Sequence, residues 1–219
     1  MSRFLLLKLV GPMQAWGDHT LETYRPVQPF PTRSGLVGLL GACLGIDWQQ
    51  RAELCALDAS FRLAVRADQD PHRPYGTTTI SDFHIVTQVR RADGQLSPHP
   101  LVTRREYLCD ASFTAALEFR PDARWSQQDV VAAVARPRYP PYLGRRCCPL
   151  SRPLLEGEVT AESLAAALAQ VPPHVGVIYS EDPEGHHSQL SVRDVMLPGR
   201  TRRFGTRQVY IRAERGGPS

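Results

Sequence analysis

The sequence predicts an α+β fold, a single domain of 219 residues built around a β-α-β-β-α-β core with insertions. Short apolar or alternating stretches typical of strands recur along the chain, and capped helical patterns lie between them. A β-rich segment with a central turn signal predicts a long hairpin that leaves the core. The chain has no internal repeat, low-complexity linker or clear change of composition, so we expect no domain boundary.

A strand and a glycine-rich helix are the first predicted elements. Residues 4–10 (FLLLKLV) form a short apolar run before a Gly-Pro pair, which predicts a buried strand. Thr32 or Ser34 is expected to cap a helix that runs to about Leu44 and stops at Gly45. The two glycines inside this helix each cost about 1 kcal/mol relative to alanine. We therefore expect the backbone of this helix to lie close to a sheet or to a ligand.

The remaining elements follow in chain order. Further strands are expected at residues 61–66, 77–89, 107–119, 175–180, 189–195 and 208–213, and further helices at residues 126–135 and 163–171. The tetrapeptide Ala92-Asp93-Gly94-Gln95 is a turn signal between two of these strands. It predicts a hairpin arm over about 77–107.

The positive charge of the chain is carried almost entirely by arginine. The formal net charge is only +4, but Lys8 is the single lysine among 26 basic residues. A GC-rich genome would explain the high ratio of arginine to lysine. The positions of the arginines along the chain are more informative about a binding partner. Residues 136–152 hold five arginines and residues 200–207 hold four, with no acidic residue in either stretch. Acid-free arginine stretches favour a polyanionic partner.

The segment 136–146 is the first candidate site for nucleic acid. Prolines stiffen it, tyrosines offer flat faces, arginines surround them, and a glycine allows close backbone approach. This mixture suits single-stranded nucleic acid, whose bases stack on rings while guanidinium groups hold phosphates. A proline-rich surface loop with its tyrosines in the core explains the composition equally well. The candidate residues are Arg138, Tyr139, Tyr142, Gly144, Arg145 and Arg146.

The start of the predicted helix is the second candidate. Thr32, Arg33 and Ser34 combine two hydroxyls and an arginine with free backbone N–H groups, which would suit a phosphate. Ordinary capping accounts for the two hydroxyl residues equally well.

Three further groups of candidates lie elsewhere. Gln14 and Trp16 could meet a base, although a tryptophan covering the edge of the core is the more ordinary explanation. Arg104, Arg105 and Tyr107 could guide a strand of nucleic acid or form a charged sheet edge that blocks aggregation. The last candidate is Arg25.

The sequence gives no sign of an enzyme, metal or cofactor. It contains no H-E-x-x-H, G-x-S-x-G or P-loop pattern, and its five cysteines include no C-x-x-C. A metal-free ribonuclease needs only a base, an acid and a cation. His19, His84 or His186 with an arginine could supply them, although nothing in the spacing singles these residues out.

No segment predicts a membrane span or a secretory signal. The uncharged stretch at residues 34–46 is far shorter than the roughly 20 apolar residues that a span needs. The apolar run at the N-terminus is too short for a signal peptide. We expect a soluble cytoplasmic protein.

Four motifs in order resemble the CasD family, subunits of the bacterial type I-E CRISPR complex Cascade. They are residues 11–17 (GPMQAWG), 30–42 (FPTRSGLVGLLGA), 105–113 (REYLCDASF) and 137–146 (PRYPPYLGRR). The resemblance implies a ferredoxin-like, RRM-type core with an inserted β-hairpin thumb, which we place at residues 77–107. It also implies antiviral defence and a subunit that caps the 5′ handle of crRNA. The implied partners are the CasC backbone subunits, the large subunit CasA and, through the complex, target DNA.

The resemblance also bears on catalysis. Some relatives in another CRISPR subtype cut precursor crRNA with a Tyr/Lys/His set. The single lysine, Lys8, falls inside the predicted first strand, so that pattern is not matched. We predict a non-catalytic subunit, and the alternative is a metal-independent endoribonuclease that processes CRISPR repeat RNA.

Overall fold

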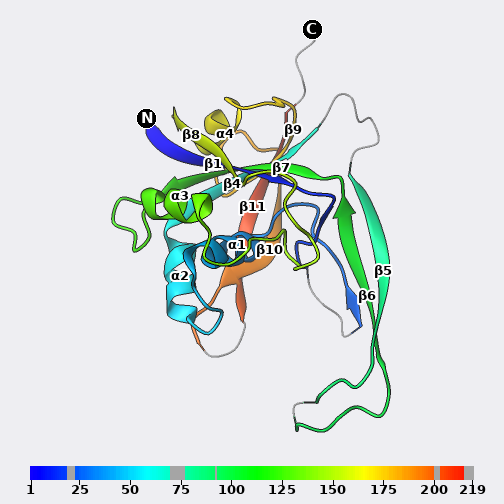
Figure 1. Cartoon of the computed structure of the whole chain (residues 1–219). Coiled ribbons are helices and arrows are strands. Elements are labelled where there is room, and N and C mark those ends of the chain that lie inside the picture. Colours follow the sequence, from blue (N-terminus) through cyan, green and yellow to red (C-terminus); the bar gives the residue numbers. More distant parts are fainter. Residues whose placement is uncertain (19–22, 70–76, 92, 200–202, 215–219) are drawn as a thin grey trace.

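A computed structural model describes residues 1–18, 23–69, 77–91, 93–199 and 203–214. The described residues form a mixed α+β fold with a seven-stranded sheet and a smaller second sheet (Figure 1). The strands of the large sheet are β1 (Ser2–Val10), β4 (Phe61–Asp68), β7 (Ser112–Phe119), β8 (Leu155–Ala161), β9 (Gly176–Ser180), β10 (Ser188–Met196) and β11 (Phe204–Glu214). Their order across the sheet is β10-β11-β9-β4-β7-β1-β8, and all neighbours are antiparallel.

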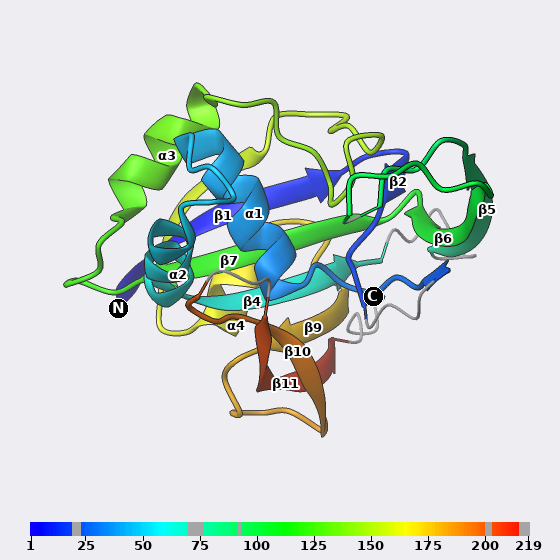
Figure 2. The same ribbon diagram turned by 90° about the horizontal axis from the view of Figure 1, so that it is seen from below.

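Helices cover both faces of this sheet (Figure 2). The helices are α1 (Arg33–Leu44), α2 (Arg51–Ala59), α3 (Gln127–Ala135) and α4 (Leu164–Leu168). Alternate residues of β1 separate the two cores. Leu5 and Leu7 pack on the side of α1, α2 and α3, whereas Phe4 and Leu6 pack on the side of α4. No helix in the described ranges is long and apolar enough to cross a membrane.

Helix α1 lies at the centre of the larger core, and its ends are those predicted. The Thr32 hydroxyl accepts a hydrogen bond from the Gly35 amide, and Gly45 ends the helix with a φ of 78°. A side chain at Gly41 would come within 2.8 Å of the Leu54 side chain in α2, so this glycine leaves room for a neighbouring helix and not for the sheet or ligand that we expected. Gly38 is exposed, and a Cβ there would meet nothing within 4 Å.

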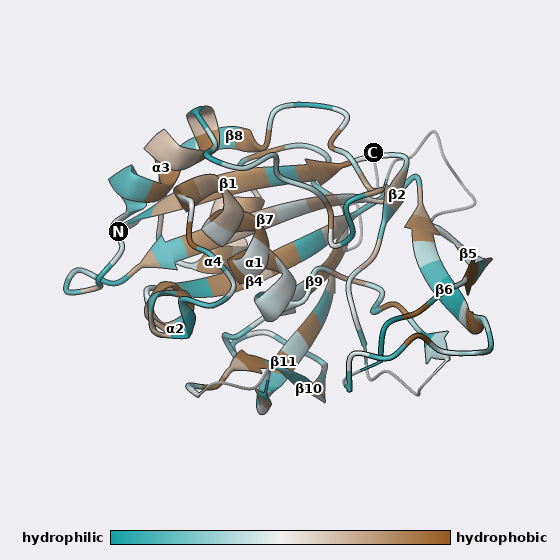
Figure 3. Cartoon of the chain, turned by 60° about the horizontal axis from the view of Figure 1, so that its bottom comes forward, coloured by the Kyte–Doolittle hydropathy of each residue, from teal (hydrophilic) through white to brown (hydrophobic). Residues whose placement is uncertain are grey.

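The second sheet carries the predicted hairpin. Its strands are β2 (Met13–Gln14), β3 (Tyr24–Arg25), β5 (Thr78–Val86) and β6 (Leu101–Cys109). Strands β5 and β6 pair from Thr78↔Cys109 to Val86↔Leu101 and extend away from the large sheet (Figure 1). Hydrophobic residues occur on this hairpin as well as in the large sheet (Figure 3). Its large apolar side chains that are exposed are Ile80, Phe83, Ile85, Val86, Leu96 and Leu101.

The predicted fold differs from the structure in several details. Helix α2 and strands β2, β3 and β8 were not expected. The single strand expected over 107–119 is interrupted at Asp110, whose φ of 56° turns the chain from β6 into β7. The turn joins two sheets, so alternation alone could not reveal it.

Candidate nucleic-acid interface

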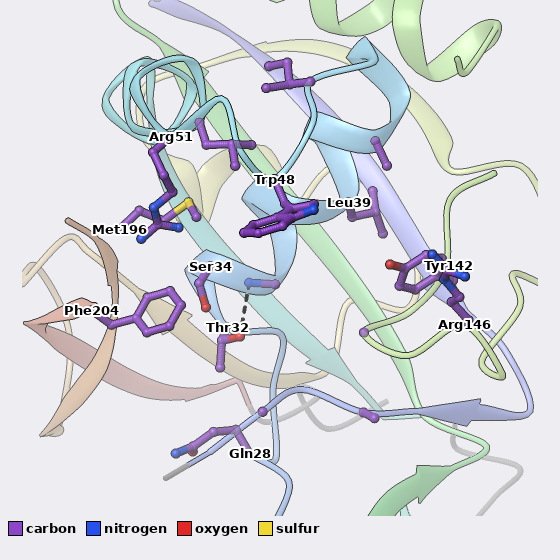
Figure 4. Close-up of a pocket in the computed structure, with 18 of the residues that line it drawn as sticks. Gln28, Thr32, Ser34, Leu39, Trp48, Arg51, Tyr142, Arg146, Met196 and Phe204 are labelled. Atoms are coloured by element: carbon purple, nitrogen blue, oxygen red, sulfur yellow. Dashed lines mark hydrogen bonds between the residues drawn. The ribbon is translucent and has the colours of Figure 1, made fainter. Parts of the chain in front are cut away.

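A groove of about 1270 Å³ runs along the exposed side of α1 (Figure 4). One wall is the loop that follows α3, and the other is formed by the start of α2 and the ends of β10 and β11. The residues of the groove on which the argument depends are Gln28, Ser34, Gly38, Trp48, Arg51, Tyr139, Tyr142, Arg146, Arg193, Arg203 and Phe204. Aromatic rings and guanidinium groups thus line one cavity from both sides.

The loop wall is fixed to α1 through backbone hydrogen bonds. The amides of Arg138 and Tyr139 donate to the carbonyls of Cys43 and Ala42 at 2.9 and 3.1 Å. These carbonyls lie in the last turn of α1, where ordinary helical partners run out, and the Ala42 carbonyl also accepts from the Gly45 amide at 3.2 Å. The loop therefore caps the helix and presents the half-exposed Tyr139 to the groove.

Gly144 sets how closely this loop approaches the chain after β1. Its φ is +90°, and a Cβ would lie 1.9 Å from the Ala15 carbonyl oxygen. The Ala15 amide donates to the Leu143 carbonyl at 3.0 Å, and Leu143 is fully buried. Only glycine fits this conformation and this contact.

The two adjacent arginines of the loop have different surroundings. The Arg145 guanidinium lies 4.6 Å from the centre of the buried Tyr107 ring and donates to the Glu106 carbonyl at 3.1 Å. It thereby fixes the loop to β6. Arg146 is exposed and lines the groove.

The opposite wall contains residues that were not singled out from the sequence. Trp48, in the connection from α1 to α2, is 57% exposed. Arg51 donates to the carbonyls of Leu197 and Arg203 at 3.2 Å and lies 5.9 Å from the Phe204 ring centre. One sequence feature could have indicated this wall: the arginine-rich stretch at residues 200–207. Arg203 of this stretch lines the groove. Arg200 and Arg202 lie outside the described residues.

Arg33 is not available to a phosphate, contrary to the prediction. It is 6% exposed, and its guanidinium donates to Asp58 and Glu181 at 2.6 and 2.5 Å and to the Phe61 carbonyl at 2.9 Å. Burial acts to lower its pKa, but the negative charges of Glu181 and Asp58 outweigh this and raise it. Burial also raises the pKa of Asp58, against the opposing effect of Arg33. Arg33 therefore holds α1, α2 and the end of β9 together.

The N-terminus of α1 already binds a carboxylate of the protein itself, that of Asp194. The Arg33 amide donates to the Asp194 carboxylate at 2.6 Å, and Arg207 donates to the same carboxylate at 2.7 Å. Asp194 of β10 thus occupies the position at which we predicted a bound phosphate. Thr32 is buried as the N-cap, whereas Ser34 faces the groove.

Gln14 and Trp16 are fully buried, so the predicted contact with a base is not available to them. The Gln14 amide donates to the carbonyls of Leu9 and Ala111, and its oxygen accepts from the Trp16 indole at 3.0 Å. The Trp16 ring packs beneath Gly35 of α1. Both residues belong to the core; the more ordinary explanation, which concerned Trp16 alone, had placed it at the edge of the core.

Arginines also gather where β3 meets the hairpin. Parallel pairing sets Tyr24 opposite Arg104 and Arg25 opposite Arg105. Arg25 and Arg104 are exposed, and Arg105 is half-buried and donates to Thr103 at 3.1 Å. The hairpin base therefore gathers three arginines, although Asp82 lies opposite Arg105 and Glu106 accepts from Tyr24 beside them.

Residues suited to RNA cleavage do not converge on the groove. Among the described residues that line it, none is a histidine. His84 lies on the hairpin 2.7 Å from Asp82, and the His186 ring lies 6.1 Å from that of Tyr210. His19 is outside the described residues. Lys8 is buried in an ion pair with Asp68 at 2.7 Å. The described residues contain no cluster of His, Cys, Asp or Glu that could hold a metal ion.

Known proteins resemble this chain over nearly its whole length. Residues 4–210 match the family described as "CRISPR-associated protein (Cas_Cas5)". The chain is 45% identical over 216 residues to the CRISPR system Cascade subunit CasD of Escherichia coli strain K12, covering 96% of each chain. A solved "CRISPR RNA-guided surveillance complex" contains a chain with a TM-score of 0.71 and 27% identity, with 96% of this chain and 89% of that chain covered. A solved "Cas protein" gives a TM-score of 0.63 and 29% identity, with 96% and 94% covered. The chain therefore belongs to the CRISPR-associated Cas5 family, and its relative CasD is a subunit of Cascade.

Proposed function

We propose that this protein is a non-catalytic subunit of a type I-E Cascade that binds and caps the 5′ handle of crRNA. In that complex it contacts the CasC backbone subunits and the large subunit CasA, and it meets target DNA only through the assembly. The 45% identity to a Cascade subunit supports this role.

The groove beside α1 is the observation that carries the RNA-binding part of the proposal. Exposed rings, Trp48 at 57% and Tyr139 at 47%, stand on its opposite walls. Arg146, Arg193 and Arg203 lie on the same walls and would hold phosphates between stacked bases. Single-stranded RNA is the ligand that uses both kinds of group at once.

The proposed contact residues come from both walls and from the hairpin base. They are Arg25, Ser34, Trp48, Arg104, Arg105, Arg138, Tyr139, Tyr142, Arg146, Arg193 and Arg203. Thr32, Tyr107, Gly144 and Arg145 support them by fixing α1 and the loop.

We further propose that the chain is one domain with a ferredoxin-like, RRM-type core. Strands β4, β7, β1 and β8 are neighbours in this order, with α1 between β1 and β4 in the chain and α3 between β7 and β8. This is the arrangement of a β-α-β-β-α-β unit. The β5–β6 hairpin is the proposed thumb, and its exposed apolar side chains would contact the start of the guide or a neighbouring subunit.

A nuclease role is less well supported. The ribonuclease alternative requires a histidine near the loop 136–146, and the described lining of the groove supplies none. The prediction is that the pure protein leaves its own repeat RNA intact in the absence of metal. Site-specific cleavage that leaves a 2′,3′-cyclic phosphate would show the alternative to be right.

Salt-dependent binding to the repeat-derived 5′ handle RNA tests the proposal. Each phosphate contact contributes about 0.7 to the slope of log K against log salt for a single strand. Arg146→Ala should weaken binding and lower the slope by about 0.7. Arg3→Ala is the matched control, because Arg3 is exposed at the start of β1, away from the groove lining, and pairs with Glu158 on the surface. Equal slopes for the two variants, or equal affinity of the native protein for a scrambled RNA, would contradict the proposal.

A further inference from the structure

Gly38 is the one glycine of α1 that the fold does not explain. A side chain at Gly35 would come within 2.8 Å of the Trp16 ring, and one at Gly41 within 2.8 Å of Leu54. Packing thus accounts for these two positions. At Gly38 a Cβ would meet nothing within 4 Å, and the backbone there is ordinary helix. Glycine in an exposed helix interior lowers stability relative to alanine, so a reason outside the packed core is needed.

The groove provides that reason, because Gly38 lies on its floor between two walls of aromatic and basic residues. Glycine is the residue that lets a ligand approach a backbone closely. Trp48 lies over α1, and Tyr142 lies with Arg146 on the loop at the other side of the groove (Figure 4). The groove volume of about 1270 Å³ exceeds the roughly 300–1,000 Å³ of ordinary ligand pockets, so it has room for more than one nucleotide.

Polar groups at one end of the floor suit the edge of a base. The Ser34 hydroxyl lies one helical turn before Gly38, and the Gln28 amide lies beyond it at the same end (Figure 4). A hydroxyl and an amide are both donors and acceptors, whereas the arginines around them serve phosphates. The gap in side chains at Gly38 and the polar end therefore match the face and the edge of one planar ring.

We propose that the groove binds an unstacked nucleobase of the handle directly against α1 at Gly38, with its edge toward Ser34 and Gln28 and with Trp48 flanking it. This inference rests on the proposed RNA-binding function and adds to it a specific base site. The absence of a side chain at Gly38 is then a requirement of the ligand and not of the fold.

The expected effects on folding and on binding have opposite signs. Gly38→Ala should raise the melting temperature by about 2–4 °C, because helix propensity improves and nothing is displaced. Gly38→Leu should fold with a melting temperature no lower than that of the native protein but bind the handle about 10-fold more weakly or worse, since it occupies the space of the base. Gly38→Gln is the second bulky variant, should Gly38→Leu prove insoluble.

A series of handle RNAs, each with one abasic position, identifies the base. For the native protein, loss of one particular base should weaken binding about 10-fold, and the same abasic RNA should cause no further loss with Gly38→Leu. Arg146→Ala is the control, because it should weaken all of these RNAs alike and leave the position-specific effect in place. If Gly38→Leu and Gly38→Gln bind the handle as tightly as the native protein, with the same abasic profile, the inference is wrong while the proposed function stands. If the native protein does not distinguish the handle from a scrambled RNA, the proposed function itself fails.

Discussion

Gly144→Ala tests whether the loop 136–146 is positioned by its contact with the chain after β1. A left-handed conformation costs a non-glycine residue about 1–2 kcal/mol. The Cβ would also lie 1.9 Å from the Ala15 carbonyl oxygen, so the loop must move away. That movement removes the 3.0 Å hydrogen bond between the Ala15 amide and the Leu143 carbonyl, at about 0.5–1.5 kcal/mol. We expect a loss of about 1.5–3.5 kcal/mol and a melting temperature lower by about 3–14 °C.

Gly94→Ala is a matched control for this prediction. Its φ of +84° is close to the +90° of Gly144, but a Cβ at Gly94 would meet nothing within 4 Å. It therefore carries only the conformational cost, at the end of the hairpin. Calorimetry should show a clearly larger decrease for Gly144→Ala, and binding of handle RNA should weaken for that variant because Tyr142 and Arg146 are displaced. Equal decreases in melting temperature would refute the reasoning that the backbone contact fixes the loop.

Three further predictions concern the buried charges, a helix cap and the cysteines. Arg33→Ala should lower the free energy of unfolding by about 3–5 kcal/mol in urea denaturation, because the buried Asp58 carboxylate loses its arginine partner while the partly buried Glu181 keeps Arg207; a loss below 1 kcal/mol would contradict this. Hydrogen bonds from Ser126 hold the pKa of Asp129 below its usual value, so the capping box adds stability above the unfolded pKa of about 3.9 and loses it as the pH falls through the lower folded pKa. The difference in melting temperature between the native protein and Ser126→Ala should therefore shrink on acidification from pH 6 to pH 3, and a constant difference would refute the assignment. Iodoacetamide at pH 8 should modify the exposed Cys147 before Cys148, because burial raises the pKa of the Cys148 thiol to about 12; mass spectrometry that finds the reverse order would contradict it.

The local signals of the sequence predicted α1 and α3 well. Thr32, Gly45 and Ser126 act through atoms within a few residues, so their roles are readable without the fold. Helix α2 was missed because its N-cap residue, Gln50, makes no side-chain capping bond. Strand β8 was missed because its sequence, LEGEVTA, contains a glycine and two glutamates and most of its residues are only partly buried.

The sequence predicted the candidate site where local composition determines which residues are exposed. It failed where partners distant in the sequence bury a residue. Tyr139, Tyr142 and Arg146 line the groove, as the pattern of their loop indicated. Arg33 has the same chemistry, but its partners Asp58 and Glu181 lie far away in the sequence, and no local pattern reveals them. A guanidinium that can serve a phosphate can equally serve a buried carboxylate.

The buried charges link the fold to the groove. Asp194 accepts from the N-terminus of α1 and from Arg207, so it ties β10 and β11 to the helix that forms the groove floor. The next residue along β10, Arg193, belongs to the groove wall. Arginine in this chain therefore has two tasks, to hold the wall in place and to supply its positive surface.

Ultraviolet crosslinking of the full chain to its repeat-derived handle RNA, followed by mass spectrometry of the attached peptides, tests the central claim most directly. The groove predicts crosslinks at Tyr139, Tyr142 and Trp48, with Gly38→Leu reducing those at Trp48. Crosslinks confined to segments outside the groove and the hairpin base, such as the turn between β9 and β10, would contradict the account.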